Sequence, residues 1–173
     1  MLAAYTPGHP SLTPADVEGS DPTVRAVASY YGPIDLRTCY LVFDQTRVAH
    51  LPKIEVGLPG AATMKKTMVD AGRMDTLLGG HLHQVPEVYD LASPLTHVKR
   101  GCPPTFMIQG EPDVITPGVA ARVLHLKLVE CGTPAVNIIY PLTQHAFDLI
   151  CPTTSPPANA ALYYFERFLA LMV

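Results

Sequence analysis

Proline is the residue that most constrains how this chain can fold. The sequence has 18 prolines in 173 residues, which is about double the average share, and they are unevenly spread. Because proline interrupts helix interiors and central strands, we expect the helices and strands to lie inside proline-free stretches. These include residues 24–32, 60–85, 105–111, 118–133, 135–140 and 158–173.

Three of these stretches predict strands. Residues 24–31 are rich in β-forming residues and end at a Gly-Pro turn, while residues 105–109 and 135–140 are short apolar runs. Apolar runs with little alternation are typical of strands buried on both faces, as in a parallel sheet. The fold class predicted from this pattern is α/β.

A helix is predicted between the last two strands. Thr116 can cap its start, Pro117 suits the first helical position, and Gly132 suits the position just past its end. Its apolar stripe at helical spacing consists of Val119, Ala120, Val123, Leu124 and Leu128. A strand, a helix and a strand within about 35 residues form a βαβ unit with parallel strands.

A second clear helix is predicted at the C-terminus. Ser155 can cap it and Pro156 can open it. The face expected to pack on the sheet consists of Ala158, Ala161, Leu162, Phe165, Phe168, Leu169 and Met172. Shorter helices are predicted at residues 61–69 and 73–78. The loop-rich stretch around them, residues 35–104, is long enough to form a lid or cap.

The composition excludes several classes of protein. With 48% hydrophobic residues the chain is not disordered, and with a net charge of −3 it offers no basic surface for nucleic acid. Its apolar runs are too short for a membrane span. The first residues lack the basic and apolar parts of a signal peptide, so we expect a cytoplasmic protein. The four cysteines show no metal-ligand spacing.

Two polar residues follow the two best strand predictions. Asp113 comes just after the strand at 105–109, and His145 comes just after the strand at 135–140. If these strands are parallel neighbours, both loops leave the same carboxyl edge of the sheet, about 4.8 Å apart. An aspartate that orients a histidine there forms two of the three members of a nucleophilic triad. We therefore take Asp113 and His145 as the candidate catalytic residues.

Four further segments carry a family signature. They are residues 27–36 (VASYYGPIDL), 77–98, 103–117 (PPTFMIQGEPDVITP) and 141–149 (PLTQHAFDL). Together they resemble the C-terminal half of the esterase and lipase branch of the α/β-hydrolase family, and the likeness spans most of the chain. The resemblance implies one partial α/β-hydrolase domain, residues 1–173, in which 105–173 is the βαβα segment and 35–104 is a lid-like insertion. It makes Asp113 the acid and His145 the base, with no metal or organic cofactor.

The nucleophile of that family is missing from the sequence. In the family a serine lies in G-x-S-x-G on a strand-to-helix turn, and an HGGG-type segment supplies oxyanion-hole amides. None of the five serines, and no cysteine, has glycine two residues before and two after it, and no HGGG-type segment is present. Residues 1–10 resemble the end of the helix that follows the nucleophile. We therefore expect the chain to begin just after the nucleophile and to show little or no esterase activity alone.

Loss of the family's other strands has a physical consequence. A strand at 24–31 without its neighbours leaves an open sheet edge, which invites pairing or aggregation. We expect a poorly stable monomer, or one that pairs with another chain through that edge.

The function indicated is a carboxylic ester hydrolase that acts on small-molecule esters, of which this chain holds the acid and the base. Two alternatives stay open: an amide-cleaving relative, such as a peptidase or formamidase, and an inactive fragment that serves as an assembly piece. His81, His83 and His97 could suggest a metal site, but no cysteine or carboxylate completes a familiar ligand set. Surface histidines are the favoured interpretation of these three.

Overall fold

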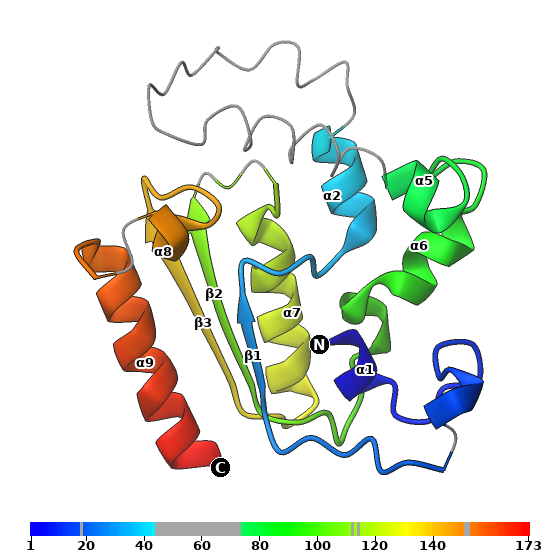
Figure 1. Cartoon of the computed structure of the whole chain (residues 1–173), viewed down its shortest axis with the longest axis horizontal. Coiled ribbons are helices and arrows are strands. Elements are labelled where there is room, and N and C mark those ends of the chain that lie inside the picture. Colours follow the sequence, from blue (N-terminus) through cyan, green and yellow to red (C-terminus); the bar gives the residue numbers. More distant parts are fainter. Residues whose placement is uncertain (18, 44–73, 112, 114, 151–152) are drawn as a thin grey trace.

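The computed structural model of the chain describes residues 1–17, 19–43, 74–111, 113, 115–150 and 153–173 (Figure 1). Its elements, with the labels of Figure 1, are α1 (Leu2–Tyr5), η1 (Ala15–Val17), β1 (Val27–Tyr30), α2 (Leu36–Phe43), α5 (Met74–Leu78), α6 (Pro86–Ala92), η2 (Pro94–His97), β2 (Thr105–Glu111), α7 (Gly118–Glu130), β3 (Ala135–Pro141), α8 (Phe147–Ile150) and α9 (Pro156–Met172).

The three strands form one parallel sheet in the order β1-β2-β3. Thr105, the first residue of β2, pairs with Val27 on one side and with Ala135 on the other. β1 is shorter than the predicted strand at 24–31 because the residues before Val27 have no β2 residue to pair with. The predicted α/β fold, with a parallel sheet flanked by helices, is confirmed.

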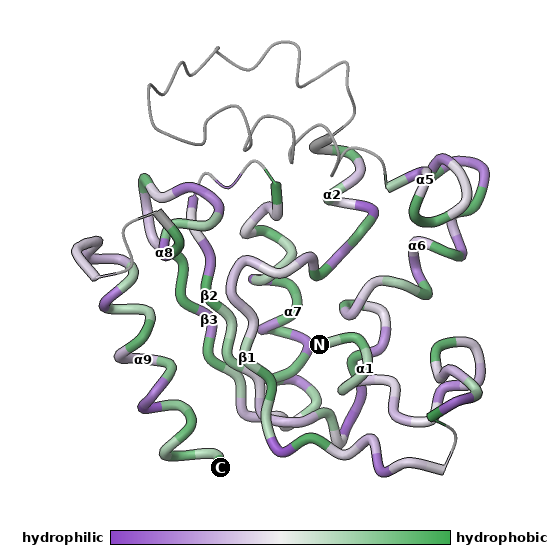
Figure 2. The backbone as a smooth tube through the Cα atoms, viewed as in Figure 1, coloured by the Kyte–Doolittle hydropathy of each residue, from purple (hydrophilic) through white to green (hydrophobic). Residues whose placement is uncertain are grey.

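Helices cover both faces of the sheet, and each face has its own hydrophobic core. α7 lies on one side and α9 on the other (Figure 1). On the α7 side, Met107 packs with Leu124 and Leu128, and on the α9 side Phe106 packs with Phe168. Hydrophobic and hydrophilic bands alternate along α9, which is the pattern of a helix with one buried face (Figure 2).

The face of α7 differs from the predicted stripe. Ala120, Leu124 and Leu128 are buried as expected, but Val119 and Val123 are exposed. Apolar residues lie on the outer face of the helix as well as on its buried face, so its periodicity does not select the buried face. In α9, similarly, Leu162 is exposed although Ala158, Ala161 and Phe168 are buried.

The helix starts also differ from the predictions. α7 has Pro117 at its cap position, begins at Gly118, and has no side-chain capping hydrogen bond, so Thr116 is not its cap. Ser155 does occupy the cap position of α9, and a proline opens that helix, but its hydroxyl makes no capping bond. Gly132 follows α7 with a φ of 76°, as predicted for the residue past a helix end.

A third hydrophobic cluster ties α2, α5 and α6 together through Cys39, Met74 and Tyr89. The predicted helix at 73–78 corresponds to α5, whereas the predicted helix at 61–69 lies outside the described residues. The role of residues 35–104 as a lid stays a prediction. Within the described ranges β1 pairs only with β2, and self-association through its other edge also stays a prediction.

Candidate active site

The carboxyl ends of the strands bring Asp113 and His145 together. Asp113 is the second residue after β2, and His145 is the fourth residue after β3. Because β2 and β3 are parallel neighbours, both loops leave the same edge of the sheet, which is the upper edge in Figure 1. Nδ1 of His145 lies 2.9 Å from Oδ2 of Asp113, which is a hydrogen-bond distance.

The carboxylate of Asp113 is fully buried and surrounded by donors. Its side chain has no exposed area. Oδ1 accepts hydrogen bonds from the backbone amides of Ile115 and Thr116, each at 2.8 Å. Oδ2 accepts from Nδ1 of His145 and lies 3.0 Å from the Thr116 hydroxyl. A buried carboxylate is costly unless such partners replace its water, so this cluster fixes the side chain in one orientation.

The loop that carries His145 is held against β2. The amide of Thr143 donates to the carbonyl of Glu111 at 3.3 Å. A Cβ on Gly110 would overlap the backbone carbonyl of Thr143, so only glycine lets the loop cross β2 this closely. Leu142 and Ala146 have φ of 54° and 59°, which gives the loop two tight bends. The result is an imidazole that is 21% exposed beside a buried carboxylate.

Tyr31 packs against the other side of His145. The ring centroids are 4.5 Å apart, and the planes make an angle of 59°. The Tyr31 hydroxyl donates to Oδ1 of Asp148 at 2.8 Å. Burial, and after it the hydrogen bond to Asp148, raise the pKa of Tyr31, so its phenol remains a donor at neutral pH. Tyr31 therefore restricts the position of the imidazole.

Sequence reasoning missed two residues of this cluster. The sequence predicts Thr116 as a helix cap, and Tyr31 is simply the last residue of the predicted strand at 24–31. Thr116 lies three residues after Asp113, and this spacing is the signal that could have found it, because a turn after an aspartate brings residue i+3 back to its carboxylate.

All five serines of the chain lie in the described ranges, and none of them hydrogen bonds to His145. Ser93, the buried one, donates to the carbonyl of Tyr89 and accepts from the amide of Leu36, so its role is structural. The Asp113–His145 pair therefore has no hydrogen bond to any of these serines.

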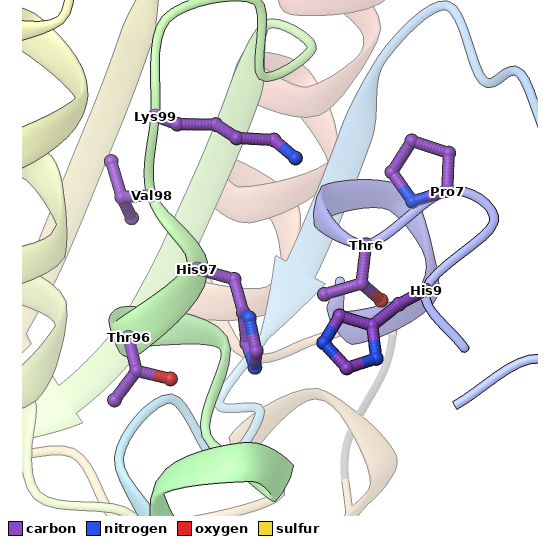
Figure 3. Close-up of a pocket in the computed structure, with 7 residues that line it drawn as sticks. All are labelled: Thr6, Pro7, His9, Thr96, His97, Val98 and Lys99. Carbon is purple, nitrogen blue, oxygen red and sulfur yellow. The ribbon is translucent and has the colours of Figure 1, made fainter. Parts of the chain in front are cut away.

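An open cavity of about 480 Å³ lies beside His145. Its other lining residues are Leu142, Thr143, Gln144, Phe147, Thr154, Ser155 and Pro157. A second cavity of about 340 Å³, between α1 and the segment that leads into β2, is lined by Thr6, Pro7, His9, Thr96, His97, Val98 and Lys99 (Figure 3). It lies near the opposite edge of the sheet from the Asp113–His145 pair, so the cavity beside His145 is the one that serves this site.

The histidines at positions 81 and 83 lie outside the site. Their rings stack with centroids 5.6 Å apart, and Nδ1 of His81 lies 3.1 Å from the Tyr40 hydroxyl. Among the residues that the structure describes, no group of three or more histidine, cysteine, aspartate or glutamate side chains could hold a metal ion. No helix in the described ranges is long and apolar enough to cross a membrane.

The parallel sheet with helices on both faces is the fold of α/β-hydrolases, and known esterases share it. The esterase Est2 of Thermogutta terrifontis, solved with propionate bound, superposes on 96% of this chain and 50% of its own length, with a TM-score of 0.60 and 17% identity. This likeness shows the fold.

A model of the BD-FAE family matches residues 10–128, more than half of the sequence, and the chain belongs to that family. Among curated relatives, the esterase LipQ of Mycobacterium tuberculosis is 28% identical over 155 residues, which are 89% of this chain and 31% of LipQ. The probable carboxylic ester hydrolase LipM of the same organism is 29% identical over 170 residues, 98% of this chain and 33% of LipM. The chain thus spans about a third of the length of the curated relatives it matches.

Proposed function

We propose that this chain supplies the acid and the base of a carboxylic ester hydrolase that works by acyl transfer. The observation that supports the proposal most is the 2.9 Å contact between Nδ1 of His145 and the buried carboxylate of Asp113, at the edge of the sheet where α/β proteins bind ligands. Two relatives described as ester hydrolases support the ester class. The serine nucleophile is proposed to come from residues outside these 173.

In the proposed cycle only His145 transfers protons. The Asp113 carboxylate accepts a hydrogen bond from Nδ1–H of His145 and stabilises the imidazolium, which leaves Nε2 free as the base. Nε2 takes the hydroxyl proton of the serine as its oxygen attacks the ester carbonyl, and the imidazolium then returns that proton to the departing alcohol. A water deprotonated by Nε2 attacks the acyl-serine, and the proton passes back to the serine oxygen while the carboxylic acid leaves.

The cavity beside His145 supports a small-molecule ester as the substrate. Thr143, Thr154 and Ser155 give it polar groups, while Leu142 and Phe147 give it apolar surface. A mixed lining of this kind fits a ligand with both an acyl or alkyl part and polar oxygens.

The test compares this chain alone with the chain fused behind the portion of LipQ that it does not match. We expect the chain alone to leave p-nitrophenyl butyrate uncleaved and a fluorophosphonate probe unattached. We expect the fusion to cleave the ester and to react with the probe, and we expect His145→Ala to lower its kcat by about 10⁶-fold. His83→Ala, which removes an exposed histidine whose ring stacks on His81, is the matched control and should leave kcat unchanged.

Each other outcome overturns the proposal in a definite way. Robust hydrolysis by the chain alone that persists in His145→Ala would mean that the pair is not the acid and base. Cleavage of p-nitroanilides without cleavage of esters would favour the amide-cleaving alternative. If the fusion folds but neither reacts with the probe nor turns over any ester or anilide, the chain is an inactive assembly piece.

A further inference from the structure

Thr116 lies just before the start of α7, but its hydroxyl does not cap that helix. It is 5% exposed, and α7 begins two residues after it without any side-chain capping bond. Threonine is a favoured residue at a helix cap, but here Pro117 holds the cap position. The Thr116 hydroxyl oxygen instead lies 2.9 Å from the carbonyl oxygen of Tyr31, 3.0 Å from Oδ2 of Asp113 and 3.3 Å from Nδ1 of His145.

These three contacts join the ends of all three strands. Tyr31 directly follows β1, Asp113 lies after β2, and His145 lies after β3. The amide of Thr116 also donates to Oδ1 of Asp113 at 2.8 Å. The amide and the hydroxyl of Thr116 are therefore both directed at the Asp113–His145 pair or at the backbone that follows β1.

The geometry selects one tautomer of His145. If Nδ1 carried no proton, it would face the carboxylate at 2.9 Å as a second acceptor, with the Thr116 oxygen at 3.3 Å beside it. If Nδ1 carries the proton, Oδ2 accepts it and the Thr116 oxygen offers a second, weaker acceptor. The single Thr116 hydroxyl proton is then shared between Oδ2 of Asp113 and the Tyr31 carbonyl. The second arrangement satisfies every group.

We propose that Thr116 is a positioning residue for His145, which holds the Asp113 carboxylate and the Nδ1–H tautomer in place through its buried hydroxyl. A catalytic role for Thr116 rests on the proposed function, whereas its contacts with Asp113 and His145 do not depend on that function. Thr116 acts through Asp113 and His145 and is not expected to touch a substrate.

The experiment is nitrogen-15 NMR of the histidine-labelled 173-residue chain, with the His145 signals identified by their loss in His145→Gln. We expect the Nδ1–H tautomer in the unaltered protein. Thr116→Val, which keeps the shape and removes the hydroxyl, should increase the other tautomer and speed exchange of the Nδ1 proton with water by about tenfold. Thr116→Ser keeps the hydroxyl and should behave as the unaltered protein. If Thr116→Val does not fold, Thr116→Ala serves in its place.

Thr133→Val is the matched control. Thr133 is also buried, and its hydroxyl donates to the carbonyl of Cys102 at the other end of the sheet. It should leave the His145 signals unchanged. The proposal is overturned if Thr116→Val leaves the tautomer and the exchange rate unchanged, or if Thr116→Ser alters them, since packing of the methyl group would then be the cause.

The readout needs no turnover, so the two proposals can fail separately. A changed tautomer in Thr116→Val together with an inactive LipQ fusion would retain the positioning role and reject the hydrolase function. Conversely, the fusion can be active and depend on His145 while the His145 signals are the same with and without the Thr116 hydroxyl. That result would reject the positioning role alone.

Discussion

The two edges of the same sheet are built differently. In the described ranges, the non-glycine residues with positive φ are Tyr31, Leu142 and Ala146, and each of them follows a strand at the carboxyl edge. At the amino edge, the turns before β2 and β3 use glycines for the same backbone conformation, Gly101 and Gly132. Positive φ costs energy in residues with a Cβ and none in glycine. The carboxyl edge therefore holds backbone strain that the amino edge avoids, which is typical of a functional site.

The two edges also differ in the polar groups that they bury. The carboxyl edge buries a carboxylate beside a partly exposed imidazole, whereas the amino edge buries a neutral pair, the Tyr5 hydroxyl and the Thr105 hydroxyl, 2.7 Å apart. A neutral hydrogen bond inside a core costs little to bury, whereas a buried charge requires several donors. We infer that the amino edge serves stability and that the carboxyl edge serves chemistry.

Gly110→Ala is expected to give the largest loss of stability, because it would push the loop after β3 away from the carboxyl edge. A methyl group at this position overlaps the backbone of Thr143, which cannot rotate away as a side chain could. We expect a loss of unfolding free energy of about 3 kcal/mol and displacement of the loop that holds His145. Urea denaturation measures the first, and the His145 NMR signals report the second.

Gly118→Ala is the control for this substitution. A Cβ there meets its nearest neighbour, a side-chain atom of Ile139, at 3.6 Å, which is an ordinary contact, and alanine is favoured over glycine in a helix. Its stability should stay within about 1 kcal/mol of the unaltered protein. Equal losses in both variants would show that the close approach at Gly110 is not what holds the loop.

The sequence was sufficient to predict the sheet and the meeting of Asp113 with His145. Apolar runs without alternation mark parallel strands, and the residues after two such neighbours must share an edge. The parts that it could not predict depend on contacts between distant segments. The apolar run predicts a strand that ends at Gln109, but β2 continues to Glu111, because Gly110 and Glu111 pair with Tyr140 and Pro141 of β3.

Local patterns also had two valid interpretations. Thr116 before Pro117 matches a helix cap, but its place three residues after Asp113 also matches a turn that returns to that carboxylate. The outer face of α7 has Val119 and Val123 where polar residues would have marked the solvent side. In both cases the tertiary contacts decided between alternatives that the sequence left equal.

Tyr31→Phe sharpens the comparison within the carboxyl edge. It keeps the ring on His145 but removes the donor to Oδ1 of Asp148, which leaves that carboxylate one partner short. We expect a stability loss of about 1–2 kcal/mol, measured by urea denaturation at pH 7. Tyr164→Phe, on the exposed side of α9, is the matched control and should lose less than about 0.5 kcal/mol. An equal loss in the control would show that the bond to Asp148 contributes nothing.

Tyr5→Phe tests the amino edge and should have the smallest effect on stability at neutral pH. We expect a loss of about 1 kcal/mol for one buried neutral hydrogen bond, measured by urea denaturation.

The pH dependence of this variant's stability carries more information. Burial raises the pKa of Tyr5 to about 12, although the hydrogen bond to Thr105 acts in the opposite direction. The unfolded chain releases this proton near pH 10, so the stabilisation is complete below pH 10 and is lost as pH rises towards 12. The phenylalanine variant should therefore lose less stability between pH 10 and 12 than the unaltered protein does, in urea titrations at a series of pH values. Parallel stability curves over that range would show that Tyr5 is not protected from ionisation, and the amino edge would then not be the neutral, stabilising edge inferred above.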